Sequence, residues 1–330
     1  MTSLTFRGDR KTILSSPALA GWANNIGLLI SLVALIVLFT SLSDVFFQWN
    51  NALNIGRASA YTGISAAITT LVLVSGALDL SIGAVMALVG VVAARLLADG
   101  HSLVVVLVVC LAVGAAVGIV NGTIVTFVGV NPFIVTIGTQ FLARGLAYAF
   151  SVVQGGELLI TRKHFLFIGQ KSVLGMPFSV WLLLVSLGVV AWVMTRTKFG
   201  RHLYAIGGSA SASRLAGIPV ERRRMQTYVL SGIGSALAGI VLASYTGAGI
   251  AYAASGVELT VIASVILGGT ALMGGRGTIF GTFLGILILG IINNGLVLLG
   301  LGNQWQLMVT GGILLLAVVV DEVRAKLAAR

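Results

Sequence analysis

Long apolar runs, separated by short polar segments, dominate the pattern of hydrophobic and polar positions along this chain. Most runs approach the roughly 20 residues that a helix needs to cross the hydrocarbon core of a bilayer. Ten membrane spans are predicted, within one, at residues 26–42, 58–74, 81–97, 103–127, 133–151, 179–195, 226–245, 259–273, 278–299 and 305–320. The pattern therefore predicts an all-α polytopic membrane protein in which 1–330 form a single transmembrane domain.

The first span is expected to be retained in the mature protein. A cleavable signal sequence carries its small-residue site after the apolar run. Here the triplet Ala18-Leu19-Ala20 precedes the run that begins at Ile26. We therefore interpret residues 26–42 as a membrane span and not as a leader.

Composition supports a membrane protein and changes the meaning of the charge. Of 330 residues, 58% are hydrophobic and 9% charged, against roughly 45–50% and about 25% in soluble domains. The net charge of +11 would suggest nucleic acid in a soluble protein, but basic residues also collect in the cytoplasmic loops of membrane proteins. We expect no nucleic-acid partner.

The distribution of basic residues predicts the orientation. Ten spans place both termini on one side, and 14 of the 20 basic residues fall on that side. They are Arg7, Arg10, Lys11, Arg196, Lys198, Arg201, Arg214, Arg222, Arg223, Arg224, Arg276, Arg324, Lys326 and Arg330. The opposite side receives Arg57, Arg162, Lys163 and Lys171. The excess predicts cytoplasmic termini.

Two kinds of internal regularity are visible. Small residues recur every four positions, which favours close helix packing in lipid; the stripes are Gly114, Gly118 and Gly122, then Gly277, Gly281 and Gly285, then Ser231, Ser235, Gly239 and Ala243. An offset of 172 positions lays 118–121 on 290–293, and therefore the fourth span on the ninth. The offset moves the chain by five spans, and because five is odd, the two copies would cross the membrane in opposite directions. This predicts two inverted repeats, as in many transporters.

The polar segment 196–224, between the sixth and seventh spans, contains a predicted short helix. Ser209 can cap a run of small residues over 210–216, and Gly217 with Pro219 would end it. Such an exposed helix suits a groove in another protein. The alternative is a solvated basic loop held near anionic lipid headgroups.

Neutral polar side chains within the spans are the candidates for a translocation pathway. Because unsatisfied polar groups are costly in lipid, they should face other helices or a wet cavity, where they could bind a neutral polyol. The set comprises Asn121, Thr136, Thr139, Gln140, Asn293 and Asn294, with Arg144 nearby. The alternative for each is a structural hydrogen bond between helices.

Acids are placed at the ends of spans. Asp79 is interpreted as a cap of the third span, and Glu258 precedes the eighth. Carriers driven by protons or sodium usually need carboxylates within the membrane. Their apparent lack favours an external energy source.

The residues that support enzyme chemistry are missing from the pattern. No lysine has the glycine spacing of a Walker motif, so this chain is not expected to bind ATP. His101, His164 and His202 are isolated, which argues against a metal site, and Cys110 lies in an apolar run. We expect no catalytic residues, no metal and no cofactor on this chain.

Four motifs in order resemble one family. They are SGALDLSIG (75–83), NPFIVTIGT (131–139), GRHLYAIGGSASASRLAGI (200–218) and VILGGTALMGGRGTIFGTFLG (265–285). The chain resembles the membrane permease subunits of ribose-type carbohydrate ABC importers, a bacterial binding-protein-dependent transport family. The resemblance implies about ten transmembrane helices in two inverted repeats, similar to the type II permease of the vitamin B12 importer.

The resemblance also implies partners and a mechanism. A second permease copy or homologue, a cytoplasmic ABC ATPase that binds ATP and Mg, and a periplasmic sugar-binding protein would complete a transporter in the bacterial inner membrane. ATP would drive alternating access to a monosaccharide or small polyol. The helix that docks the ATPase would comprise Ser209, Ala210, Ser211, Ala212, Ser213, Arg214, Leu215, Ala216 and Gly217.

Departures from the family pattern and other functions remain open. Ser209 and Ala212-Ser213 stand where family members often carry an Asn and an Ala-Ala pair, and Ala77 replaces a usual Gly. The alternatives are a secondary carrier for a small polar solute, or an ABC permease for an amino acid or nucleoside. An intramembrane enzyme would lack a catalytic constellation.

Overall fold

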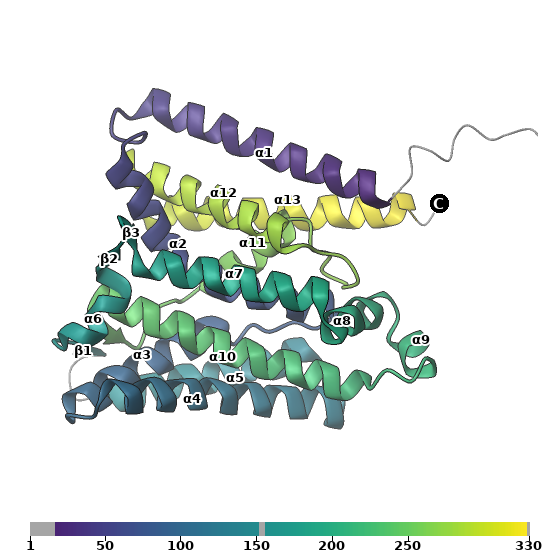
Figure 1. Ribbon diagram of the computed structural model, residues 1–330, viewed down its shortest axis with the longest axis horizontal. Coiled ribbons are helices and arrows are strands. Elements are labelled where there is room, and N and C mark those ends of the chain that lie inside the picture. The colour runs from purple at the N-terminus through teal and green to yellow at the C-terminus, as the bar shows by residue number, and fades with distance from the viewer. Residues whose placement is uncertain (1–16, 152–155, 329–330) are drawn as a thin grey trace, which may run out of the picture.

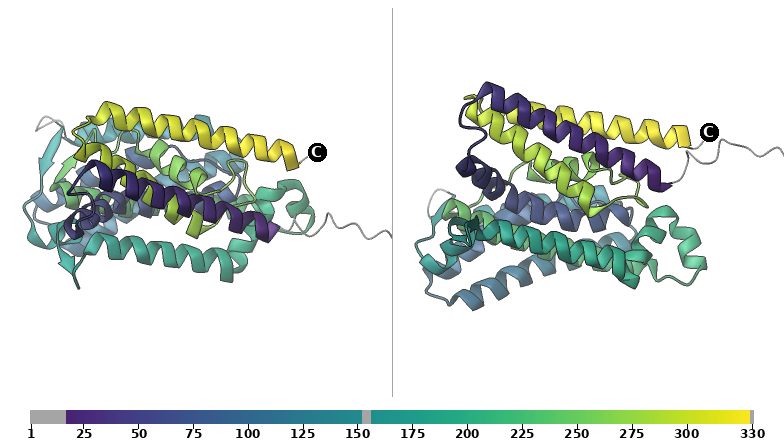
Figure 2. Two further views of the ribbon diagram at one scale, coloured as in Figure 1. Left: turned by 90° about the horizontal axis from the view of Figure 1, so that it is seen from above. Right: turned by 45° about the horizontal axis from the view of Figure 1, so that its top comes forward.

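The computed structural model describes residues 17–151 and 156–328. Its helices are α1 (Pro17–Leu42), α2 (Trp49–Val74), α3 (Ile82–Ala98), α4 (Leu103–Thr123), the π-helical η1 (Ile124–Val128), α5 (Pro132–Ser151), α6 (Lys163–Gln170), α7 (Phe178–Arg196), α8 (Lys198–Gly208), α9 (Ala210–Leu215), α10 (Val220–Thr246), α11 (Val257–Leu267), α12 (Ile279–Leu298) and α13 (Asn303–Ala328). Two small antiparallel pairs join β1 (Glu157–Leu159) to β4 (Ala248–Ile250) and β2 (Ser172–Val173) to β3 (Met176–Pro177). The long helices run roughly along one axis of the molecule (Figures 1 and 2).

Among the described residues, seven helical segments are long and apolar enough to cross a membrane, judged by length and composition. They are Asn25–Leu42, Trp49–Val74, Leu103–Val128, Pro132–Ser151, Phe178–Arg196, Val220–Thr246 and Ile279–Leu298. The other three predicted spans correspond to shorter apolar helices, at Ile82–Ala98, Val257–Leu267 and Gln304–Val319. The polytopic all-α architecture is therefore confirmed, whereas the count of ten complete spans is not.

Several predicted boundaries were wrong for identifiable reasons. α2 and α10 begin nine and six residues earlier than predicted, because Asn and Arg residues continue both helices beyond the apolar run. The eighth predicted span, 259–273, is helical only to Leu267. There the chain turns at Gly269, whose φ of 88° is left-handed, a conformation that glycine adopts without steric cost.

Two short helices, α3 and α11, start inside the bundle. α3 follows the buried, non-helical segment 75–81, which returns from the end of α2. α11 follows segment 251–256, which runs along α3: the Ala254 carbonyl lies so close to Gly83 that a Cβ there would collide with it. At 11 residues, α11 is only about 16 Å long, too short for a bilayer core of about 30 Å.

The two halves of the chain repeat the same helix contacts. α10 packs on α4 as α2 packs on α12, and α3 packs on α5 as α11 packs on α13. α4 runs toward the end of the molecule that carries α9, where η1 faces Arg214 across a cavity. α12 begins at that end and runs away from it. Its start is located there by Tyr204 of α8, which donates a hydrogen bond to the carbonyl of Gly277, just before α12. Opposite directions are what an inverted repeat requires.

The small-residue stripes form tight helix contacts, as predicted. A Cβ on Gly118 would collide with the Tyr228 carbonyl of α10, and Gly285 has the same relation to Ser264 of α11. Cys110 is buried in the core, as expected. At these glycines the backbone of α4 lies directly against the backbone of α10, and that of α12 against α11.

The two ends of the molecule differ in character. α8 and α9 project at one end, together with the C-terminal end of α13 and the first residues of α1 (Figure 1). α6 and the β pairs lie at the other end. Both described ends of the chain therefore lie on the side of α9.

Candidate functional site

A buried cluster, here called the polar centre, joins segment 75–81 to three helices. Asp79 is 2% exposed. Its Oδ1 accepts bonds from the Ser81 backbone N–H at 2.9 Å and the Ser81 hydroxyl at 2.6 Å, and its Oδ2 accepts from the Ser231 hydroxyl of α10 at 2.7 Å. Asn121 of α4 donates to Ser81 Oγ at 3.0 Å and accepts from Thr139 of α5 at 2.6 Å. All five side chains are buried.

A second acid lies where α11 begins. Glu258 is 7% exposed, and its Oε1 accepts a bond of 2.9 Å from Gln140 of α5. Its Oε2 has no hydrogen-bond partner in the described part of the chain and lies beside Gly83, in the first turn of α3. One turn along α5, Arg144 donates to the carbonyls of Ala251 and Ala253 at 2.7 and 2.6 Å. α5 therefore holds both segment 251–256, which leads into α11, and the start of α11 itself.

The predicted pathway residues are divided by the fold. Asn121, Thr139 and Gln140 meet at the polar centre and beside Glu258. Thr136 is fully buried and bonds the Pro132 carbonyl of its own helix. Asn294 exchanges two bonds, of 3.0 and 2.9 Å, with Asn51 of α2, which makes it a structural contact between α2 and α12.

Asn293 does not join this group. It lies on α12 and is half-buried, and its Oδ1 has no hydrogen-bond partner within residues 17–151 and 156–328. The offset that lays Asn121 on Asn293 therefore matches the helices but not their hydrogen bonds. A role of any of these residues in translocation stays a prediction.

Sequence reasoning missed the central position of the two acids. Asp79 and Glu258 do lie near helix ends, but those ends are inside the protein because both helices are preceded by non-helical segments. The N-cap of α3 is Ser81, not Asp79. The prediction that these acids lie at the ends of spans holds for their position along the chain, but it did not anticipate that both carboxylates are buried. A usable signal was present: two short, glycine-interrupted apolar segments in corresponding halves mark the binding region of many transporters.

The predicted short helix exists as α9. The Ser209 hydroxyl accepts from the Ala212 N–H at 3.2 Å and caps its start. Gly217, at φ 77°, ends it with bonds from its own N–H to Arg214 O and from Ile218 N–H to Ser213 O, both 3.0 Å. Leu215 is 92% exposed.

α10 connects the neighbourhood of α9 to the polar centre. Near its start, Glu221 pairs with Arg214 of α9 at 2.7 Å. Farther along, Arg224, Tyr228 and Ser231 bond Ser75 O, Leu78 O and Asp79, at 3.3, 3.1 and 2.7 Å. Spacings of four and three residues place these three side chains on one helix face. These three bonds tie α10 to segment 75–81.

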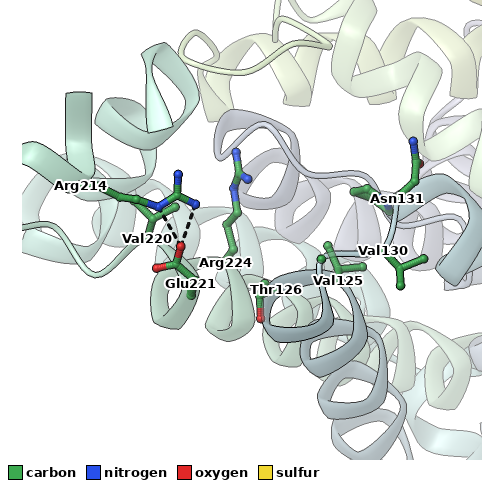
Figure 3. A pocket seen from close by; sticks show the side chains of 10 residues that line it. Val125, Thr126, Val130, Asn131, Arg214, Val220, Glu221 and Arg224 are labelled. Carbon is green, nitrogen blue, oxygen red and sulfur yellow. Dashed lines mark hydrogen bonds and ion pairs between the residues drawn. The ribbon is translucent and has the colours of Figure 1, made fainter. Parts of the chain in front are cut away.

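A cavity of about 290 Å³ opens beside this connection (Figure 3). It lies between α9 and the start of α10 on one side, and η1 and the start of α5 on the other. Its lining consists of Val125, Thr126, Gly129, Val130, Asn131, Pro132, Arg214, Val220, Glu221 and Arg224. Among the described residues, no group of three or more His, Cys, Asp or Glu side chains could hold a metal ion.

Comparisons with known proteins cover nearly the whole chain. Residues 51–318 match the protein family described as "Branched-chain amino acid transport system / permease component". The ribose import permease protein RbsC of Escherichia coli (strain K12) is 38% identical over 295 residues, which are 89% of this chain and 92% of that protein. RbsC of Bacillus subtilis (strain 168) is 36% identical over 302 residues, 91% and 94% of the two chains.

Another relative is named for a different sugar. The L-arabinose ABC transporter permease protein AraH of Azospirillum brasilense is 36% identical over 292 residues, 88% of this chain and 86% of that protein. No solved structure matches the chain. The similarity to the vitamin B12 importer therefore stays a prediction.

Proposed function

This chain belongs to the family of branched-chain amino acid transport system permease components, and from that membership we propose that it is the membrane-spanning subunit of an ATP-driven sugar importer. It is a multi-pass membrane protein. Relatives named for ribose and L-arabinose cover about nine tenths of it. The solute is then a monosaccharide or a similar small polyol.

The choice of a sugar over an amino acid is supported by Arg144. An arginine beside the pathway would be the obvious partner for a substrate carboxylate. Here Arg144 Nη1 is engaged by the carbonyls of Ala251 and Ala253, so it anchors segment 251–256. Neutral amides and hydroxyls dominate the remaining polar groups, and these suit the hydroxyls of a sugar.

The observation that carries the role of α9 is the exposed Leu215. α9 is held at both ends, by the Ser209 cap and the Gly217 turn, yet presents an apolar side chain to solvent. Docking of Ser209–Gly217 into a groove of a cytoplasmic ABC ATPase would bury it. The ATPase would bind ATP and Mg, and this chain would bind neither and catalyse no reaction.

The connection through α10 supports a mechanism of alternating access. When the ATPase closes on ATP, it moves α9, and the Arg214–Glu221 pair moves α10 with it. The bonds from Arg224, Tyr228 and Ser231 then move segment 75–81. This segment lies next to the starts of α3 and α11. The candidate pathway residues Asn121, Thr139 and Gln140 lie at this point.

The assembly and orientation follow from the same proposal. Residues 1–330 act as one permease domain, beside a second copy or homologue, in the bacterial inner membrane. The basic end that carries α8 and α9 faces the cytoplasm together with both termini. A periplasmic binding protein delivers the sugar to the opposite end.

The docking role of α9 is tested by Leu215→Asp. We expect this change to abolish copurification of the ATPase, because it places a charge in an apolar groove, while the permease still inserts and purifies. The matched control is Leu174→Asp, since Leu174 is 87% exposed in the turn between β2 and β3 at the opposite end. Undiminished ATPase binding by Leu215→Asp would contradict the assignment.

The energy source is tested on the assembled transporter. Uptake into proteoliposomes should stop when the ATPase carries a hydrolysis-dead active site and should survive collapse of a proton gradient. The reverse pattern would favour a secondary carrier, an alternative that the buried carboxylates Asp79 and Glu258 make worth excluding by experiment.

A further inference from the structure

The cavity beside α9 carries a charge that its own residues do not balance. Arg214 is neutralised by Glu221, which accepts from its Nε at 2.8 Å and its Nη2 at 2.7 Å. Arg224 forms one hydrogen bond, from Nε to Ser75 O, so in the described part of the chain its two terminal nitrogens have no hydrogen-bond partner. Figure 3 shows this guanidinium apart from the Arg214–Glu221 pair. The lining therefore has one net positive charge.

Two helix N-termini add to this positive potential. α5, of 20 residues, begins at Pro132, and α10, of 27 residues, begins at Val220; both residues line the cavity. The residue before α10 is Pro219, which offers no side-chain cap. The first N–H groups of a helix carry a partial positive charge and bind anions. Glu221 lies in the first turn of α10 and Asn131 caps the Phe133 N–H of α5, so both helix starts are partly satisfied already. Arg224 is therefore the principal group that an anion in this cavity would meet.

The rest of the lining fits a ligand larger than a bare ion. Asn131 uses its Oδ1 to cap Phe133 N–H at 2.9 Å, which leaves its amide N–H₂ as a donor. Val125, Val130 and Val220 supply apolar wall. The volume of about 290 Å³ lies near the lower limit of small-molecule sites. A phosphate group with a small polar or apolar body attached matches these dimensions and groups.

We propose that this cavity binds a phosphate-bearing anion from the cytoplasmic side, with Arg224 as its principal ligand. The bound group would bridge α10 to the start of α5. It would thereby join α10, which follows the proposed ATPase-docking helix α9, to α5, which holds Gln140 and Arg144. That the cavity faces the cytoplasm rests on the orientation given under the proposed function. Anion binding itself does not depend on the transported solute or on the ATPase.

The phosphate group could belong to a soluble metabolite or to a lipid headgroup, and the experiment separates the two. The full-length chain is placed in phosphatidylcholine nanodiscs without the ATPase, and calorimetry measures binding of inorganic phosphate and of a pentose 5-phosphate. An unphosphorylated pentose is the negative control. A parallel set of nanodiscs contains phosphatidylglycerol, with retained lipid measured by native mass spectrometry.

We expect phosphate and the pentose phosphate to bind in phosphatidylcholine, and Arg224→Gln to weaken both by about tenfold or more. Arg222→Gln is the matched control, because Arg222 is exposed on the same turn and does not line the cavity. Retention of phosphatidylglycerol that depends on Arg224, without binding of the soluble probes, supports the site and assigns it to lipid. Val130→Trp would fill the cavity and should therefore also abolish binding. This variant tests the site independently if Arg224→Gln does not fold.

Absence of both soluble binding and selective lipid retention would overturn the proposal. Equal binding by wild type and Arg224→Gln would do the same. Neither result bears on α9, because the ATPase is absent from this experiment, so failure of this site and failure of the docking role are distinguishable.

Discussion

Gln140 of α5 donates a hydrogen bond of 2.9 Å to Oε1 of Glu258, a residue 118 positions away at the start of α11. Gln140 is the hydrogen-bond partner of a carboxylate that is 7% exposed and whose other oxygen has no partner among the described residues. The bond ties one of the long apolar helices to a short helix that begins inside the bundle.

Gln140→Leu should reduce uptake by about tenfold, because it leaves a buried carboxylate without a donor, at a cost of at least about 1–3 kcal/mol. Proteoliposome uptake and the midpoint of thermal unfolding measure the effect. Asn293→Leu is the comparison, since the Asn293 Oδ1 has no hydrogen-bond partner to lose among the described residues. We expect it to change uptake less than twofold. Equal effects of the two variants would remove Gln140 from the candidate pathway.

Asp79→Asn should destabilise the protein by about 1–2 kcal/mol, because the amide keeps one acceptor but disturbs the three bonds that Asp79 receives. Ser231→Ala removes the bond from α10 alone. A double-mutant cycle of these two changes should give a coupling energy of about 0.5–3 kcal/mol. The free energy of unfolding in detergent supplies the four values. Strict additivity would mean that the Asp79–Ser231 bond does not hold segment 75–81.

Gly118→Ala should destabilise the packing of α4 on α10 by about 1–3 kcal/mol, because its Cβ would collide with the Tyr228 carbonyl. Gly138→Ala on α5 provides the control, since a Cβ there meets nothing within 4 Å. That change should be neutral or slightly stabilising, as alanine favours helix. Thermal unfolding of the two variants compares them directly. A tolerated Gly118→Ala would show that α4 can move away from α10.

Gly217→Ala should weaken ATPase binding about fivefold through backbone strain alone. Gly217 has a φ of 77°, and a Cβ there meets nothing within 4 Å. A non-glycine residue in this conformation costs about 1 kcal/mol, so α9 would lose its defined end. Gly208→Ala is the control, with open space and no positive φ. Titration of the permease with purified ATPase measures both, and equal affinities would contradict the role of this turn.

Local features of the molecule were predictable from short stretches of sequence. The helix α9 has its predicted cap at Ser209 and its predicted turn at Gly217, because both depend on hydrogen bonds within a few residues. The glycine stripe from Gly114 was correctly assigned to packing, since period four places small residues on one helix face.

The candidate site was predicted only in part, and the reason is geometric. Asn121, Thr139 and Gln140 were selected as neutral polar residues within apolar runs, and the fold brings them to neighbouring positions. Asn294 was selected by the same criterion but bonds Asn51, on α2. Hydropathy reports which side chains need a partner, and it carries no information about which partner they find.

The sequence by itself determined the membrane-spanning all-α class, the likeness to sugar permeases and the position of α9, because apolar length, ordered motifs and helix caps are encoded locally. Tertiary structure alone decided that α3 and α11 begin inside the bundle and that Asp79 and Glu258 are therefore buried. A hydropathy plot records such acids at the ends of spans, since it measures position along the chain. Their depth depends instead on segments 75–81 and 251–256, whose non-helical backbone is stable there because α10 and α5 satisfy its polar groups.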